Sequence, residues 1–258
     1  MAEYVDIERA VAMNGVRVVL PPGIPNPWGE ALKGILYVKK IPLIRVRHDR
    51  TDYAPLIRWT AQSSAPVMVY NDERPRSVWN DQLFLAERLQ PEPALVPSNP
   101  SDRALMFGLS NELCGENGFG WSRRLMLIHG VATDPKAAEE AKQGMLAFGA
   151  KYGYSPAAIA AAPGKIAQIL RAFAERLETQ KSHGSRYLIG DQLSALDIYW
   201  AAFAALIEPL PENLCPIPTD LRRRYVCEDP VVRAAATPQL LAHRDFIYHE
   251  HLELPMDL

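Results

Sequence analysis

The sequence predicts a small α/β domain followed by an all-helical domain within one polypeptide of 258 residues. Three observations support this order. Short β-branched runs occur only in the first part of the chain, closely spaced prolines fill residues 91–101, and helical spacing of apolar residues continues beyond them. We therefore expect domains at residues 1–90, with a short N-terminal extension over residues 1–15, and at residues 102–258, joined by a semi-rigid linker.

The α/β domain is expected to begin with a strand, a helix and a second strand. Val16–Leu20 is a β-branched run that ends at a Pro-Pro-Gly turn, as in a buried strand. Pro27 suits the first turn of a helix, and apolar residues follow it at spacings of three and four. Residues 42–47 then alternate as a half-buried strand, and we expect its arginines to face water.

The rest of this domain reads as a loop, a hairpin and a helix. A variable segment around Trp59 is expected to be a loop, and residues 67–70 and 76–79 resemble two strands joined by turn-forming residues. Residues 81–89 place apolar side chains at helical spacing. The predicted order is therefore βαβ followed by ββα.

Beyond the linker the chain carries helix formers and no further strand signal. Helical spacing is found in residues 102–131, 136–151, 164–179, 194–208 and about 228–248.

Composition and charge exclude several classes of protein. The formal net charge is −2, with acidic and basic residues mixed, so no nucleic-acid partner is expected. No apolar run approaches the roughly 20 residues that span a bilayer, so no membrane partner is expected either. The 3 cysteines lack metal-ligand spacing, which favours a cytoplasmic protein and predicts no metal site.

A capping-box pattern marks one helix start clearly. Ser194 fits an N-cap and Asp197 the N3 position, while Leu193 and Ile198 can form a hydrophobic staple. Any helix can start in this way, so taken alone the pattern indicates only a cap worth about 0.5–2 kcal/mol.

The context of this box resembles the glutathione S-transferase superfamily, in its bacterial type, over nearly the whole chain. Ala65-Pro66-Val67 looks like the cis-proline element of that family, and Leu188-Ile189-Gly190-Asp191 precedes the expected capped helix. The resemblance implies a thioredoxin-like domain that binds glutathione, an all-α bundle that supplies the pocket for a second substrate, and a homodimer.

The resemblance also implies how glutathione would be held. A cis bond before Pro66 would leave the N–H and C=O of Ala65 free to pair with the cysteinyl unit, whereas the alternative is a trans loop proline. Asp81 would accept the ligand's ammonium group, and Gln82 with the helix start would hold its carboxylate. Asp81 could equally be a plain N-cap, and the two roles are compatible.

The position that activates the thiol is unusual in this sequence. The loop between the first strand and the first helix has no Ser, Cys or Tyr, and Asn26 stands where a catalytic Ser is common in the family. An amide can donate to a thiolate, and the positive end of a helix lowers a thiol pKa. Alternatively, Asn26 only shapes a proline-rich turn. Trp28 is expected to line the pocket. Without a cysteine in this loop, a glutaredoxin-like mechanism is disfavoured.

Residues 112–124 are expected to lie on the first helix of the helical domain, facing the thiol. The glycines in this segment predict a kink or a close substrate approach, or else interdomain packing. Phe119 and Trp121 could wall a pocket and Arg123 or Arg124 could contact an anion, although aromatic residues at helical spacing are more often core.

Together these features predict a cytoplasmic, homodimeric glutathione transferase-like enzyme acting in detoxification. It would conjugate the thiol of glutathione, its co-substrate, to a small hydrophobic electrophile. The alternative is a non-catalytic protein of the same fold that binds a ligand or another protein.

Overall fold

The computed structural model describes residues 3–258. The first half of the chain is built on a three-stranded sheet in the order β2-β1-β3. Strand β1 (Val16–Leu20) lies in the centre, parallel to β2 (Leu43–Arg47) and antiparallel to β3 (Val67–Tyr70). Val18 of β1 is opposite Arg45 on one side and Met68 on the other. The mixed sheet and the long helical part that follows confirm the predicted fold class.

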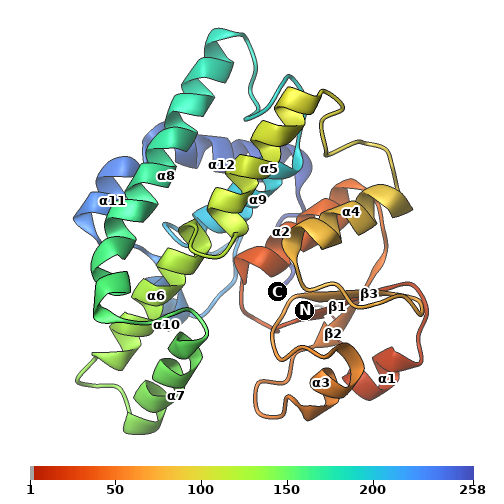
Figure 1. Cartoon of the computed structure of the whole chain (residues 1–258), viewed down its shortest axis with the longest axis vertical. Coiled ribbons are helices and arrows are strands. Elements are labelled where there is room, and N and C mark those ends of the chain that lie inside the picture. Colours follow the sequence, from red (N-terminus) through yellow and green to blue (C-terminus); the bar gives the residue numbers. More distant parts are fainter. Residues whose placement is uncertain (1–2) are drawn as a thin grey trace.

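Helices cover both faces of this sheet (Figure 1). Helices α2 (Pro27–Val38) and α4 (Trp79–Leu89) pack on one face, where Val18 and Leu20 are buried. Helices α1 (Ile7–Val11) and α3 (Ala54–Thr60) cover the other face, where Val19 is buried. The side chains of β1 alternate between two apolar cores, which explains why all of its residues except Arg17 are apolar.

Three local expectations about this half are wrong. The strand expected at residues 76–79 is a single bridge between Arg76 and Met68, because Val78 is already the N-cap of α4. The loop expected around Trp59 contains α3. Arg45 does not simply face water, since it forms an ion pair with Asp257 at 3.0 Å.

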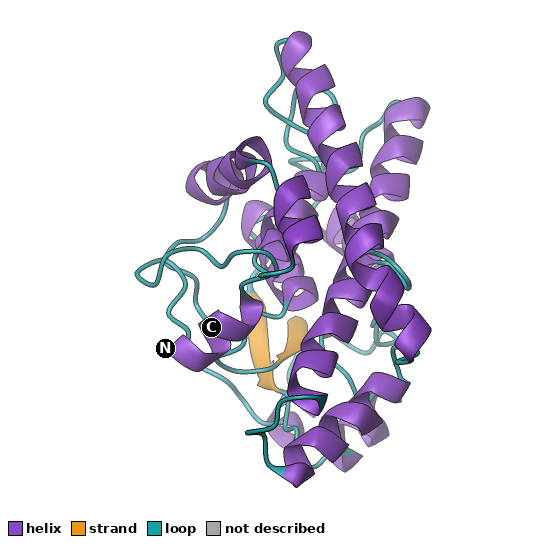
Figure 2. Cartoon of the chain, turned by 90° about the vertical axis from the view of Figure 1, so that its left-hand side faces the viewer, coloured by secondary structure: helices purple, strands orange, loops and turns teal. Residues whose placement is uncertain are grey.

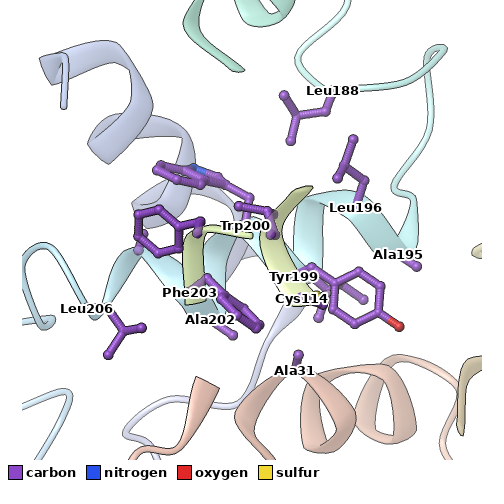
Figure 3. Close-up of a cluster of buried hydrophobic side chains, with 14 of the residues drawn as sticks. Ala31, Cys114, Leu188, Ala195, Leu196, Tyr199, Trp200, Ala202, Phe203 and Leu206 are labelled. Carbon is purple, nitrogen blue, oxygen red and sulfur yellow. The ribbon is translucent and has the colours of Figure 1, made fainter. Parts of the chain in front are cut away.

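The second half is all-helical (Figure 2), and one of its helices is buried among the others. Helix α9 (Ala195–Ala204) is buried along its whole length and packs against α2, α5 and α12. Figure 3 shows Ala31 of α2 pointing toward Cys114 and α9, so the two halves share one core. The remaining helices are α5 (Pro100–Cys114), α6 (Phe119–Ala132), α7 (Glu139–Ala150), α8 (Pro156–Ser182), α10 (Thr219–Tyr225), α11 (Pro230–Ala235) and α12 (Pro238–His251).

The capping box at the start of α9 is formed as predicted. Asp197 has no solvent exposure, and its Oδ2 accepts the Ser194 N–H at 2.9 Å. Its Oδ1 accepts the Leu188 N–H at 2.8 Å and lies 3.2 Å from His243 Nε2. One carboxylate therefore joins the preceding turn, the helix start and α12.

The continuous helix expected over residues 102–131 is broken between α5 and α6. Gly115 caps the end of α5 and Gly118 caps the start of α6. A Cβ at either position would lie within 2.6 Å of a carbonyl oxygen of α5. No larger side chain fits at either position, and the helix is interrupted here, whereas the sequence had left a kink, a close substrate approach or interdomain packing open.

The proline-rich segment between the halves is held by a buried lysine. Lys39 Nζ donates to the carbonyls of Gln90 at 2.8 Å and Pro93 at 2.9 Å, and pairs with Glu87 at 2.7 Å. The boundaries of residues 91–101 as a domain linker stay a prediction. Within the described part of the chain, no helix is long and apolar enough to cross a membrane.

Candidate functional site

Asn26 joins the start of α2 to the loop before β3. Its Oδ1 accepts the N–H of Trp28 at 3.1 Å, which makes Asn26 the N-cap of the helix. Its Nδ2 donates to the carbonyl of Ala65 at 3.3 Å. Pro27 at the first helical position has no N–H, so the cap satisfies the first free donor of α2. The side chain therefore shapes the turn and also contacts the predicted peptide-binding loop.

The Ala65–Pro66 peptide bond is cis, as the sequence predicted. The carbonyl of Ala65 keeps a second lone pair beside the Asn26 bond. The N–H of Ala65 has no hydrogen-bond partner among residues 3–258. One donor and part of one acceptor thus remain available at this turn.

Gln82 supports this turn from inside the protein. Its side chain is buried, and Nε2 donates to the carbonyls of Pro66 at 3.3 Å and Arg76 at 3.0 Å. These bonds tie the cis-proline turn to the single bridge that follows β3.

Asp81 lies at the third position of α4, not at its N-cap. Val78 is the N-cap, so the interpretation of Asp81 as a plain cap is wrong. The Asp81 carboxylate pairs with Arg74 at 3.2 Å, and its side chain is 36% exposed. Its remaining lone pairs can accept a further donor.

Trp28 packs between the two halves of the protein. Its Nε1 donates to the carbonyl of Cys114 at 2.9 Å, and its ring meets Phe203 edge-on at 4.9 Å. A Cβ on Gly120 would lie 2.9 Å from the Trp28 ring and 2.5 Å from Phe203. Close packing of α6 on Trp28 therefore requires glycine at position 120. This agrees with interdomain packing, one of the alternatives that the sequence left open for this glycine.

His48 follows β2 directly, and no motif in the sequence marks it as a site residue. Its Nε2 lies 3.2 Å from the carbonyl oxygen of Ser63, two residues before Ala65. Burial lowers the pKa of His48, and the charges of Arg50 and Lys151 act in the same direction. A neutral imidazole at neutral pH follows.

The adjacent arginines of α6 differ completely in their surroundings. Arg123 is buried and donates to several carbonyls, among them Leu206 at 2.8 Å and Val226 at 3.2 Å. The Arg124 guanidinium lies 5.8 Å from the Trp28 ring centre and 6.0 Å from that of Phe148. Sequence reasoning named both as anion contacts without separating them; only Arg124 is free for that role.

A cavity of about 340 Å³ lies away from these residues. Lys33, Tyr37, Arg45 and Glu253 are among the residues that line it, and none of the candidate residues does. Among residues 3–258, no group of three or more His, Cys, Asp or Glu side chains is placed to hold a metal ion.

Three of the predicted site residues, Asn26, Ala65 and Pro66, therefore meet at one turn. Gln82 lies directly behind them, and Asp81 lies beside Gln82 on the surface of α4. Trp28 extends from the same helix start into the interface between the halves. This arrangement defines a two-part architecture, an α/β half with a cis-proline turn docked on a helical bundle.

Comparison with solved structures identifies the fold class. A glutathione S-transferase from Methylobacillus flagellatus with GSH bound has a TM-score of 0.62 at 13% identity, covering 90% of this chain and 94% of that one. One from Methylobacterium radiotolerans, in complex with glutathione sulfonate, has a TM-score of 0.58 at 18% identity and covers 91% of both chains. One from Xanthobacter autotrophicus has a TM-score of 0.58 at 14% identity, covering 94% and 97%.

Neither a protein-family model nor a curated protein sequence matches the chain. The protein has the glutathione S-transferase fold, which confirms the resemblance at the level of the fold.

Proposed function

We propose that the protein is a glutathione transferase-like enzyme that adds the thiol of glutathione to a small hydrophobic electrophile. The observation that supports this most directly is the contact between Asn26, the N-cap of α2, and Ala65 of the cis-proline turn. In this proposal the cysteinyl unit of glutathione pairs with the backbone of Ala65, and its sulfur faces Asn26. Two solved structures of the same fold hold glutathione or its sulfonate, as their descriptions state.

Asn26 has one donor left for the sulfur. A side-chain amide carries two hydrogens, and only one is used by the Ala65 carbonyl. The second amide hydrogen and the positive end of α2 would stabilise the thiolate. The thiol proton then leaves to water, the sulfur forms a bond to the electrophilic carbon, and the leaving group departs with the electrons of its own bond.

The γ-glutamyl end would be held at the start of α4. Asp81 would accept its ammonium group while sharing its carboxylate with Arg74. The Gln82 amide nitrogen already donates to two carbonyls, so in this proposal Gln82 acts mainly by holding the Pro66 turn in place.

The second candidate is a non-catalytic protein of the same fold that carries a ligand or binds another protein. The absence of Ser, Tyr and Cys from the loop before α2 favours it. Glutathione-resin retention and a thermal shift in millimolar glutathione separate the two, because a ligand present at 100 times its Kd adds about 2.7 kcal/mol of stability. No retention and no shift would reject the enzyme. Glutathione binding without conjugation of any electrophile would support the second candidate.

A homodimer through the outer face of α4 and α5 belongs to the same proposal. Phe84 is 52% exposed although its ring stacks on Phe107 at 5.3 Å, and the neighbouring Val78 is also exposed. A second copy covering these side chains would remove apolar area from water. Sedimentation of the protein should give a dimer that Phe84→Glu converts to monomer; a wild-type monomer would contradict this part.

We also propose a cytoplasmic location and a detoxification role. The three cysteines, Cys114, Cys215 and Cys227, are buried and unpaired, as in proteins of a reducing compartment. Localisation of the tagged protein by cell fractionation tests the first point.

A further inference from the structure

We propose that the second substrate carries a carboxylate or similar anionic group, and that Arg124 binds it. This inference rests on the proposed function, since it concerns the substrate that would meet the glutathione sulfur near Asn26. It narrows the substrate class from any hydrophobic electrophile to an aromatic acid.

Arg124 is a partly buried cation that forms no hydrogen bond or ion pair within the described residues. Four arginines have an Nε that is shielded from solvent and forms no hydrogen bond within the described residues. Three of them engage their terminal nitrogens: Arg17 with backbone carbonyls, Arg45 with Asp257, and Arg222 with the carbonyls of Leu210 and Cys215. Arg124 forms no hydrogen bond or ion pair with any residue in 3–258.

The guanidinium of Arg124 lies over the ring of Trp28, close to the start of α2. Arg124 follows Gly120 by one helical turn of α6, on the side that packs on Trp28. Arg124 therefore belongs to the helical half and lies against Trp28. Trp28 is two residues after Asn26, the residue that would face the glutathione sulfur, and its backbone N–H donates to the Asn26 side chain.

Lys151 is a second cation whose charge interacts with that of Arg124. Partial desolvation lowers the pKa of Lys151, and the charge of Arg124 lowers it further. No carboxylate in the described chain pairs with either side chain. Lys151 is exposed, so it adds to the positive potential beside Arg124, and such a potential favours an anionic ligand.

The aromatic surroundings define the rest of the ligand. Trp28 and Phe148 flank the guanidinium, with ring centres at 5.8 and 6.0 Å. Cation–π contacts at these distances use none of the guanidinium N–H groups as hydrogen-bond donors, so these groups remain free to donate to a ligand. Such a site suits an aromatic ring bearing a carboxylate, which the fork of an arginine can bind through two hydrogen bonds.

The test compares two ligands with the same ring and nearly the same shape, an anionic carboxylate and its neutral carboxamide, neither of which is activated for attack by a thiol. Binding of 4-methyl-3-nitrobenzoate and 4-methyl-3-nitrobenzamide is measured by calorimetry on the full chain without glutathione. We expect the wild type to bind the benzoate about tenfold more tightly, and Arg124→Met to lose this preference. Arg171→Met, at an exposed position of α8, is the matched control and should keep it.

Several outcomes overturn the proposal. A wild type without preference for the benzoate does so, as does an Arg124→Met variant that keeps the preference. The glycine ethyl ester of glutathione lacks the charge of the glycine carboxylate. If the wild type prefers glutathione over this ester and Arg124→Met loses that preference, Arg124 binds the glycine carboxylate of glutathione and the proposal is wrong. Should Arg124→Met fail to fold, Arg124→Lys and the fall of wild-type benzoate affinity with added salt decide the question.

Failure of the proposed function gives a different result. Benzoate binding is measured without glutathione, so it can be lost or kept independently of glutathione affinity. A protein that prefers the benzoate through Arg124 but does not bind glutathione would keep Arg124 as a binding site for an aromatic acid and would reject both the transferase and the role of that acid as its second substrate.

Discussion

The side-chain amide of Asn26 donates to the carbonyl of Ala65 at 3.3 Å, across 39 residues of sequence. The same side chain caps α2 through the N–H of Trp28. Asn26 therefore fixes the distance between the helix start and the cis-proline turn, the two parts that would hold the cysteinyl unit of glutathione.

Substitution of Asn26 separates its capping role from its proposed role in thiol activation. Asn26→Ala should lose both and cost about 0.5–2 kcal/mol in the free energy of unfolding. Asn26→Asp keeps a good cap but replaces the amide donor with a negative charge. In both variants the pKa of the bound glutathione thiol should rise, most in Asn26→Asp, and the pH dependence of thiolate ultraviolet absorbance measures it. An unchanged thiol pKa in both would remove Asn26 from the mechanism.

Gly120 and Gly130 lie on the same helix and should respond to alanine with opposite signs. Gly120→Ala places a methyl group against Phe203 and Trp28 and should destabilise the protein by about 1–3 kcal/mol. Gly130 has no atom within 4 Å of a Cβ, so Gly130→Ala should stabilise α6 by about 0.5–1 kcal/mol. Urea denaturation followed by circular dichroism compares the two. Equal effects would show that packing on Trp28 does not decide the cost.

Asp197 should matter more for stability than the cap residue it supports. Asp197→Ala leaves the buried N–H groups of Leu188 and Ser194 without their acceptor and should cost about 3–5 kcal/mol. Ser194→Ala removes one hydroxyl and should cost about 0.5–2 kcal/mol. Chemical denaturation of both variants provides the comparison, and a smaller loss for Asp197→Ala would contradict it.

His48 should make the folded state less stable in mild acid. Its pKa is lowered below the usual 6.5 by burial, so the unfolded chain takes up a proton first as pH falls. The stability that neutral His48 contributes is complete above about pH 6.5 and is lost as pH falls from there through the lowered value. His48→Gln keeps a donor for the Ser63 carbonyl but cannot titrate.

The measurement for His48 is the free energy of unfolding at several pH values. The difference between wild type and His48→Gln should shift toward the variant as pH falls below about 6.5. A constant difference across that range would show that His48 titrates alike in the folded and unfolded chain.

The features that were predicted correctly are those that a short stretch of sequence determines. The β-branched run of β1 and the capping box at Ser194 were read correctly, because propensity and cap chemistry act over a few residues. Helix α3 was missed since seven residues beginning beside a proline give little apolar periodicity.

Features that depend on distant contacts could not be read from the sequence. Trp28 could be a pocket wall or a packing residue, and only the carbonyl of Cys114 and the ring of Phe203 show its packing role. Arg123 and Arg124 are adjacent and chemically identical, yet the carbonyls around Leu206 occupy one and leave the other free. Successive side chains on a helix point about 100° apart, so two neighbouring arginines can meet entirely different surroundings.

The packing of Trp28 has a consequence for how such a protein can diversify. A substitution at Gly120 or Phe203 would displace the Trp28 ring, so under the proposed function it would alter thiol chemistry together with substrate choice. A substitution at Arg124 removes only a cation–π contact to the same ring at 5.8 Å. Under the proposed function, a change between acidic and neutral electrophiles can therefore arise at Arg124, whereas a change at Gly120 or Phe203 also disturbs the packing of Trp28.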